Sequence, residues 1–180
     1  MLRAVVLVLA AAALPAGAAP CYSVDAAHGR VSFELPQAGS PFRGQFRRFG
    51  GRICVGAEGA TLIEVWLDPA SIDSGVPEID AALRGGDFFA VRQYPQIAFA
   101  SQAVQMRGGA QLAHGVLQLK GKRRDLDVSF SLRRDAGNLN LSGSLMLNRL
   151  DYGIGTGEWS NTDWLGADVE VKFQARLSAE

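Results

Sequence analysis

The stretch "DLDVSFSLRRDAGNLNLSGSLMLN", residues 125–148, decides the fold class. It contains two runs in which apolar and polar residues alternate, separated by the turn-forming sequence Asp-Ala-Gly-Asn. An alternation with a period of two places every second side chain on the same face of a β-strand. That face carries Leu126, Val128, Phe130, Leu132, Leu139, Leu141, Leu145 and Leu147. The stretch therefore predicts a half-buried antiparallel hairpin.

The same alternation continues on both sides of this hairpin. It runs through residues 168–177 and recurs between residues 31 and 119. Short links such as 107–109 and 121–124, rich in glycine and charged residues, separate neighbouring runs as hairpins require. The apolar positions of these further runs are Val31, Phe33, Leu35, Ile53, Val55, Ile63, Val65, Leu67, Ile97, Phe99, Leu117, Leu119, Val169, Val171, Phe173, Ala175 and Leu177. We predict about eight antiparallel strands, arranged as a barrel or a sandwich.

One segment, "VPEIDAALRGG" at residues 76–86, has a different periodicity. Its apolar residues Ile79, Ala82 and Leu83 follow the spacing of an α-helix. Pro77 suits the first turn of that helix, and the two final glycines suit its end. The expected fold is therefore all-β, with one short helix inserted between the middle strands. A closed barrel of about eight strands is just wide enough to be filled by side chains or to hold one small ligand.

Residues 1–18, "MLRAVVLVLAAAALPAGA", have the features of a secretory signal peptide. Arg3 precedes an apolar run that is too short to span a bilayer, and small residues suit cleavage near Ala18. We therefore expect an exported protein whose remaining part, residues 19–180, forms a single domain. Cys21 would carry the acyl anchor of a lipoprotein, but the proline before it does not suit a lipoprotein cleavage site.

Composition and motifs argue against several classes of function. The chain carries 18 basic and 18 acidic side chains, so no net field attracts nucleic acid or anionic lipid. It has no Gly-x-Ser-x-Gly or Cys-x-x-Cys motif, and its two histidines, His28 and His114, are far apart in the sequence. We therefore expect no metal site and no cofactor. An enzyme that uses Asp87, Asp151 or His28 as acid or base stays an alternative, although nothing in the sequence pairs these residues.

Cys21 and Cys54 are the only cysteines of the chain. If the first strand turns near residues 37–41 and pairs back on itself, Leu35 lies opposite about Phe42, and the same register brings Cys21 close to Cys54. An oxidising compartment would then allow a disulfide. Two unpaired thiols remain the alternative.

Two polar segments allow more than one interpretation. Lys120, Lys122, Arg123 and Arg124 gather on a predicted hairpin turn, where charged residues are expected because turns are solvated. Contact with an anionic membrane or a pyrophosphate is the alternative. The connection at residues 149–164 mixes glycine, aromatic and acidic residues, and it either rims an opening or is an ordinary loop with aromatic anchors.

Taken together, the motifs of the chain resemble the YceI-like family of exported bacterial proteins that bind polyisoprenoid lipids. The resemblance covers most of the chain from Tyr22 to about Leu177. It implies a lipocalin-like antiparallel barrel in the periplasm, with a helix between the middle strands and a long apolar tunnel for an isoprenoid chain. The matching motifs are "YSVDAAHGRVSFEL", "GQFRRFGGRI", "VWLDPASIDSG", "ALRGGDFFAVRQYPQIAFAS", "GVLQLKGKRRDLDV" and "NRLDYGI".

The resemblance also implies where a ligand binds. The adjacent Phe88 and Phe89, with the Tyr-Pro step after them, are expected to fold back over the barrel as a structural plug or as part of the tunnel wall. The expected mouth and headgroup residues are Arg84, Asp87, Tyr94 and Asp151. The expected tunnel lining is Phe33, Val65, Phe88, Phe89, Phe99, Leu117, Leu119, Phe130, Leu141 and Phe173.

The resulting expectation is a non-catalytic protein that carries or sequesters an isoprenoid lipid such as a quinone or a polyprenyl phosphate. Its partner is the lipid, with no nucleic acid and no stable membrane insertion, and a homodimer is compatible with the sequence. The small inward residues Gly143 and Ala175 agree with a cavity, but they agree equally with the taper of a filled barrel. A ligand-free structural or stress-related module with a filled barrel is therefore the rival hypothesis.

Overall fold

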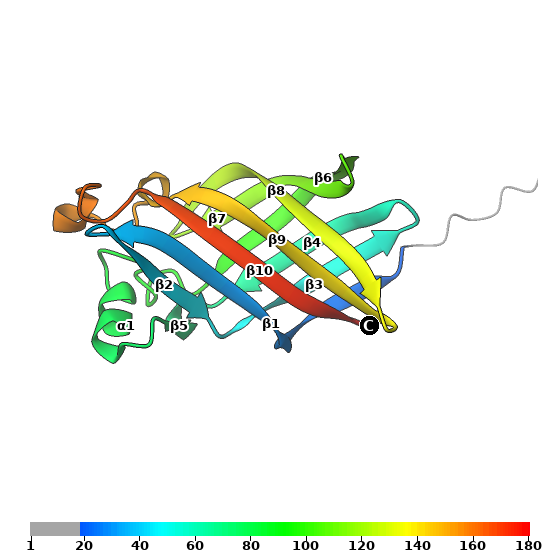
Figure 1. The fold of residues 1–180 in the computed structure, drawn as a ribbon, viewed down its shortest axis with the longest axis horizontal. Coiled ribbons are helices and arrows are strands. Elements are labelled where there is room, and N and C mark those ends of the chain that lie inside the picture. Colours follow the sequence, from blue (N-terminus) through cyan, green and yellow to red (C-terminus); the bar gives the residue numbers. More distant parts are fainter. Residues whose placement is uncertain (1–18) are drawn as a thin grey trace, which may run out of the picture.

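The computed structural model describes residues 19–180, so the predicted signal peptide at residues 1–18 lies outside the described residues. The described chain forms an elongated barrel of long, tilted strands (Figure 1). The strands are β1 (Cys21–Gln37), β2 (Ser40–Phe46), β3 (Phe49–Gly56), β4 (Gly59–Leu67), β5 (Ile72–Asp73), β6 (Ile97–Arg107), β7 (Ala110–Leu119), β8 (Lys122–Asp135), β9 (Asn138–Asn148) and β10 (Asp168–Ala179). The helices are α1 (Pro77–Leu83) and three short 3-10 turns at Pro69–Ser71, Arg149–Tyr152 and Gly157–Ser160.

Eight of the strands close into a ring. The order around it is β1, β10, β9, β8, β7, β6, β4 and β3, and β3 pairs back with the beginning of β1. All neighbours are antiparallel, β2 lies along the second half of β1, and β5 pairs with the outer edge of β2. The predicted all-β barrel with one helix between its middle strands is therefore confirmed, in preference to a sandwich.

The two ends of the barrel differ in their connections (Figure 1). At one end lie the tight turns β3–β4, β6–β7 and β8–β9, together with the start of β1 and the end of β10. We call this the turn end. At the other end lie α1 and the long connections at residues 84–96 and 149–167, and we call this the loop end.

The turn end is closed by packing and by a covalent bond. Cys21 and Cys54 are register partners on β1 and β3 and form the predicted disulfide. Leu35 lies opposite Phe42 on β2, as the hairpin argument requires, and the register shifts by two residues between the β1–β2 pairing and the β1–β3 pairing that joins the cysteines. The apolar side chains that fill the barrel below the disulfide include Ile53, Ala60, Leu139 and Leu177, all buried in the core.

Helix α1 is fixed at the loop end by polar contacts on both of its sides. Pro77 occupies its first turn, and the Asp80 carboxylate accepts hydrogen bonds from the backbone N–H and the hydroxyl of Ser74 at 2.7 Å each. Just after the helix, the Arg84 guanidinium donates to the carbonyls of Ala70 and Ile72 at 2.9 Å each. These bonds hold the helix against β5, so its apolar face covers the barrel interior.

Candidate functional site

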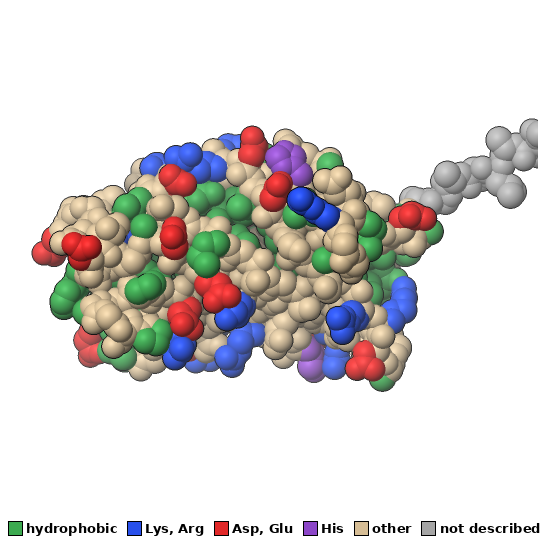
Figure 2. Space-filling view, turned by 45° about the horizontal axis from the view of Figure 1, so that its top comes forward, with side chains coloured by type: hydrophobic (Ala, Val, Ile, Leu, Met, Phe, Trp, Pro, Cys, Tyr) green, Lys and Arg blue, Asp and Glu red, His purple; other side chains and the backbone are tan. Residues whose placement is uncertain are grey.

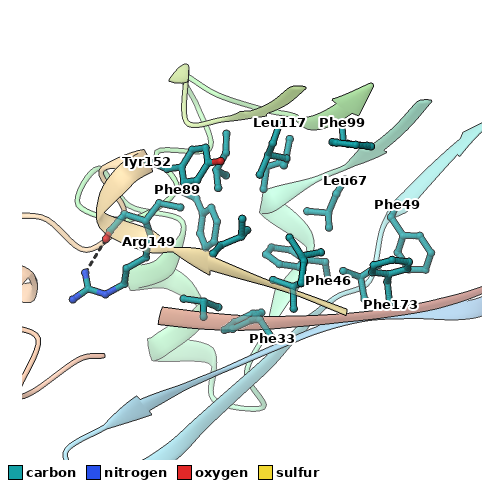
Figure 3. A pocket seen from close by; sticks show the side chains of 18 of the residues that line it. Phe33, Phe46, Phe49, Leu67, Phe89, Phe99, Leu117, Arg149, Tyr152 and Phe173 are labelled. Carbon is teal, nitrogen blue, oxygen red and sulfur yellow. Dashed lines mark hydrogen bonds between the residues drawn. The ribbon is translucent and has the colours of Figure 1, made fainter. Parts of the chain in front are cut away.

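An apolar cavity of about 490 Å³ extends from the loop end into the interior of the barrel. Its volume lies within the range of about 300 to 1,000 Å³ that is typical of small-molecule sites. All ten residues predicted to line a tunnel border this cavity, and their role in ligand binding stays a prediction. Figure 3 shows the rings of Phe33, Phe46, Phe89 and Phe173 around this space.

Two of the aromatic rings in the cavity wall lie over glycines of the neighbouring strand. Phe33 is the register partner of Gly44, and Phe173 is the register partner of Gly143. A Cβ atom on Gly143 would lie 2.5 Å from Cζ of Phe173 and 2.6 Å from the carbonyl oxygen of Ser129, and a Cβ on Gly44 would overlap the Phe33 ring. The glycines therefore let the rings lie against the wall, which keeps the interior open. Gly143 points inward, as expected, but Phe173 covers it.

The connection at residues 84–96 folds back over the cavity. Phe88 is only 7 % exposed, and its ring lies 5.5 Å from the ring of Trp159. The Phe89 ring meets the Phe46 ring edge-on at 5.6 Å. Both phenylalanines border the cavity. The bulky residues of this irregular segment thus form the wall of the cavity at its loop end.

Arg149 anchors the second long connection. The side chain is 3 % exposed, and each of its five N–H groups donates to a backbone carbonyl oxygen. Nε donates to Gly166 at 2.9 Å, Nη1 to Ile154 and Gly155 at 2.8 Å each, and Nη2 to Trp159 and Leu165 at 2.7 Å each. The Arg149 side chain therefore holds the connection at residues 149–167 together through these hydrogen bonds.

The charge of Arg149 is not neutralised by a carboxylate among the described residues, because all of its hydrogen-bond partners there are carbonyl oxygens. Burial lowers the pKa of the Arg149 guanidinium from its ordinary value, although an arginine remains protonated at any physiological pH. Arg149 borders the cavity, but it has no N–H left to offer a ligand. Its role is to hold the loop that closes the site.

The two connections at the loop end are joined to each other. The Asp87 carbonyl accepts hydrogen bonds from the backbone N–H of Gly155 at 2.8 Å and of Thr156 at 3.1 Å. The Lys120 ammonium bridges the carbonyls of Gly86 at 2.8 Å and Gly153 at 2.7 Å. Burial lowers the pKa of Lys120 from its ordinary value. The connections therefore form one cover, so a ligand cannot pass between them without breaking these bonds.

The four residues predicted at the mouth do not line the cavity. Arg84 holds the end of α1, and Asp87 contributes its carbonyl to the joined connections. The Tyr94 ring lies against Gly121, whose Cβ would come within 2.6 Å of it. Asp151 lies on the outer surface, where its carboxylate is 3.7 Å from Arg124. The role of the four residues in headgroup binding stays a prediction.

Sequence reasoning missed several residues of the site. The connection at residues 149–164 was open to two interpretations, and it contributes Arg149, Tyr152, Ile154 and Trp159 to the cavity wall. Its mixture of aromatic residues and glycines was the available signal. Nothing in the sequence indicated that the arginine would be buried, because its partners are carbonyls distributed along the loop.

Polar groups are scarce around the cavity. Gln37, Glu78 and Gln174 border it, but Glu78 and Gln174 are exposed and Gln37 is half-buried. Among the described residues that line the cavity, Arg149 is the one charged residue that is fully buried, and all of its N–H groups already donate to backbone carbonyls. The interior therefore offers dispersion contacts and dry surface, which suit a hydrocarbon chain.

The histidines lie away from this site. His28 contacts the Asp25 carboxylate at 2.7 Å, and His114 contacts the Asp127 carboxylate at 2.8 Å, both outside the cavity lining. The hydrogen bond from His28 is the largest cause that lowers the pKa of Asp25. Within residues 19–180, no three His, Cys, Asp or Glu side chains gather in a group able to hold a metal ion. No helix in that part of the chain is long and apolar enough to cross a membrane.

Comparisons with known proteins agree with this architecture. Residues 22–177 match the YceI-like domain. A UPF0312 protein of Vibrio parahaemolyticus is 31 % identical over 125 residues, a match that spans 66 % of this chain and 66 % of that relative. The crystal structure of Burkholderia cenocepacia BcnA superposes with a TM-score of 0.81 at 28 % identity, over 85 % of this chain and 98 % of BcnA.

A more distant solved structure has the same fold. It is a polyisoprenoid-binding domain from Saccharophagus degradans implicated in plant cell wall breakdown. It superposes with a TM-score of 0.71 at 16 % identity, over 88 % of this chain and 98 % of that domain. At this identity the likeness concerns the fold.

Proposed function

The chain belongs to the YceI-like domain family, and from this premise we propose that it binds the tail of an isoprenoid lipid in its cavity, without catalysis, to carry or sequester it. The observation that supports this most is the chemistry of the cavity, an apolar space of about 490 Å³. Among the described residues that line it, Arg149 is the one charged residue that is fully buried, and its N–H groups all donate to backbone carbonyls. The polyisoprenoid-binding domain of Saccharophagus degradans shares the fold and points to the same ligand class. A quinone and a polyprenyl phosphate are the candidate lipids.

Burial of the tail alone supplies enough free energy for useful affinity. At about 0.8 kcal/mol per buried CH₂, a five-carbon isoprene unit gains roughly 3 to 4 kcal/mol before ordering costs. A few such units therefore reach about −8 kcal/mol, which corresponds to micromolar binding. The headgroup then does not need a partner inside the cavity.

The periplasm is the compartment that we propose for this function. A disulfide such as Cys21–Cys54 persists in an oxidising compartment, in agreement with export. The lipid is the only ligand that the proposal needs, and it includes no metal or further cofactor. The protein would shield an insoluble chain from water between membranes.

The rival hypotheses have less support. A filled barrel does not agree with the open volume of the cavity. An enzyme would require acid or base groups beside the bound molecule, yet Asp87, Asp151 and His28 lie outside the cavity lining and in separate places. No observation favours either rival.

The test is purification from a bacterial periplasm without detergent, followed by native and denaturing mass spectrometry. Leu141→Trp fills the cavity, whereas Ser142→Trp places the same side chain on the outer face of the same strand. We expect the wild-type protein and Ser142→Trp to retain a stoichiometric isoprenoid and Leu141→Trp to lose most of it. Circular dichroism checks that both variants are folded.

A wild-type protein that is empty and also takes up neither added ubiquinone nor undecaprenyl phosphate would refute the proposal. Equal lipid content in the two folded tryptophan variants would show that the lipid lies somewhere other than in the cavity.

A further inference from the structure

The wall of the barrel is incomplete between β8 and β9. Register pairing of these strands starts at Ser129 with Ser144 and runs to Asp135 with Asn138 at the turn end. The first half of β8, residues 122–128, pairs with β7, and the last residues of β9, 145–148, pair with β10. Among the described residues no register pair joins these two half-strands across the seam. We call this stretch the side opening.

A second incomplete seam, between β4 and β6, is closed by polar side chains. Register pairing there stops at Glu64 with Ala100. Beyond that point, the backbone N–H of Ile63 donates to the Ser101 hydroxyl at 2.8 Å, and the N–H of Ala60 donates to Oε1 of Gln111 at 2.7 Å. Gln111 is 7 % exposed, so its amide fills that gap. The seam between β4 and β6 is thus sealed.

The side opening is covered by apolar side chains instead. Three side chains lie between the cavity and an open depression on the outer surface and border both spaces. They are Leu126 of β8, Leu147 of β9 and Tyr152. The cavity and the outer depression therefore meet at these side chains. Apolar contacts are non-directional, and parting them breaks no backbone ladder. Figure 2 shows hydrophobic side chains recessed in this side of the molecule, near a group of basic side chains.

Polar groups border the outside of the opening. Arg123 contacts Gln118 at 3.4 Å, a weak bond that leaves most of its donors to solvent. Arg124 lies 6.0 Å from the centre of the Tyr152 ring and donates to the Asp151 carbonyl at 3.2 Å. The carboxylates in the depression are Asp125 and Asp151, and the second is 3.7 Å from Arg124.

Tyr152 adds a polar atom, its hydroxyl oxygen, at the boundary between the two spaces. Its side chain is 3 % exposed, and no described residue forms a hydrogen bond with its hydroxyl. Burial raises the pKa of this phenol, so the group stays protonated and can donate. Lys122, whose ammonium donates to the Asp151 carbonyl at 3.2 Å, adds a further positive charge beside Arg123 and Arg124.

We propose that the side opening between β8 and β9 admits the lipid tail into the cavity and that Arg123, Arg124 and Tyr152 hold an anionic phosphate headgroup at its outer rim. This inference rests on the proposed function. The cover at the loop end is joined by hydrogen bonds, several of them between backbone groups, and the turn end is packed. The side opening is spanned only by apolar contacts and by the exposed bonds of Lys122 and Arg124 to the Asp151 carbonyl, so it is the described part of the wall that can part at the lowest cost. Arginine guanidinium groups match phosphate oxygens in charge and geometry.

The route is tested by obstructing the opening. The native cysteines are paired, so a single introduced cysteine reacts selectively. Met146→Cys lies in the outer depression at a residue that is 60 % exposed, and Met106→Cys is the control on β6 at a residue that is 55 % exposed. Each is labelled with a bulky, charged maleimide dye, and uptake of farnesyl phosphate is followed by native mass spectrometry. We expect the labelled Met146→Cys protein to fail to load during the time in which the labelled Met106→Cys protein saturates.

The headgroup site is tested with two probes that share a tail. Arg123→Gln should weaken farnesyl phosphate binding about tenfold or more, as expected for the loss of a hydrogen bond to a charged group, and leave farnesol binding unchanged. Tyr152→Phe should also weaken the binding of farnesyl phosphate. Arg133→Gln, at an exposed position in the other half of β8, is the matched control and should change neither.

The outcomes separate the two proposals. Equal loading of the two labelled proteins would overturn the side opening while leaving lipid binding intact. Equal losses of farnesyl phosphate and farnesol affinity in Arg123→Gln would overturn the headgroup site. Failure of the unlabelled wild-type protein to bind either probe would overturn the proposed function, and this inference with it.

Discussion

The two ends of this barrel are built from the same strands but are stabilised in different ways. At the turn end, Ile53, Leu139 and Leu177 fill the interior, and a disulfide ties the first strand to β3. At the loop end, the interior is open, and two long connections cover it through backbone hydrogen bonds and buried cations such as Arg149. The turn end therefore acts as the scaffold and the loop end as the site.

The difference shows how one barrel combines stability with an unfilled space. A cavity forfeits the dispersion contacts that a filled core would make, so its cost has to be offset elsewhere in the chain. Here Phe33 and Phe173 lie over glycines and keep the space clear, while polar anchors replace apolar packing at the cover. Removing an anchor should therefore destabilise one end of the barrel and leave the other end unchanged.

The largest effect is expected from Arg149→Met. The change leaves five carbonyls without their donor, three of them in buried hydrogen bonds, and unsatisfied buried groups cost about 1 to 3 kcal/mol each, so a loss of roughly 5 kcal/mol in unfolding free energy is expected. Urea denaturation measures this loss. Hydrogen exchange should show that amides of the loop end lose protection while those of the turn end keep it.

Arg149→Lys is the control, because lysine keeps the charge but has three donors that cannot span the same five carbonyls. It should recover less than half of the lost stability. A stability of Arg149→Met close to that of the wild type would contradict the view that this side chain organises the cover.

A smaller loss is expected when the disulfide is removed by the double change Cys21→Ser and Cys54→Ser. The cysteines are 33 residues apart, and closing a loop of that length contributes about 3 to 4 kcal/mol in the chain-entropy description. Thermal and urea unfolding measure the loss. Because neither cysteine borders the cavity, lipid content should stay unchanged. A variant that remains folded yet loses its lipid would break the separation between the ends.

The smallest effect concerns Asp73, on β5 beside α1. Hydrogen bonds from the Gln45 side chain, the Gly75 backbone N–H and Arg47 lower the pKa of its carboxyl below the ordinary value of 3.8. A lowered folded-state pKa stabilises the protein above the unfolded-state pKa, and this contribution disappears as the pH falls through the folded-state pKa.

Asp73→Asn should therefore be slightly less stable than the wild type at pH 6, and the difference should narrow at an acid pH below the ordinary carboxyl pKa of 3.8. Urea denaturation at the two pH values gives the comparison. A gap that is independent of pH would assign the loss to packing instead of to the carboxylate.

The sequence predicted most of the scaffold, because strand pairing in hairpins is local and periodic. Alternation identified the inward face of every long strand, and the ten predicted lining residues, among them Phe130 and Leu141, border the cavity. The register of the first hairpin brought Cys21 close to Cys54, and the structure pairs them through β3 in a register shifted by two residues. Helix signals around Pro77 located α1.

The loop end was predicted less well. Arg84 was expected at the mouth, but its guanidinium donates hydrogen bonds to the carbonyls of Ala70 and Ile72, which are more than ten residues away in the chain. Arg149 was not singled out, because five carbonyl partners carry no pattern of residue types. Irregular connections are fixed by where the backbone ends up, and periodicity contains no information about that.

The sequence by itself determined most of the strands, their inward faces and the helix, and it favoured the disulfide, because these depend on spacing within one or two neighbouring segments. Only the tertiary structure decided that Phe173 lies over Gly143, that Arg149 holds the cover, and that β8 and β9 separate beyond Ser129. These features arise from contacts between segments brought together by barrel closure. The cavity inside the barrel therefore depends on the closure of the whole ring of strands.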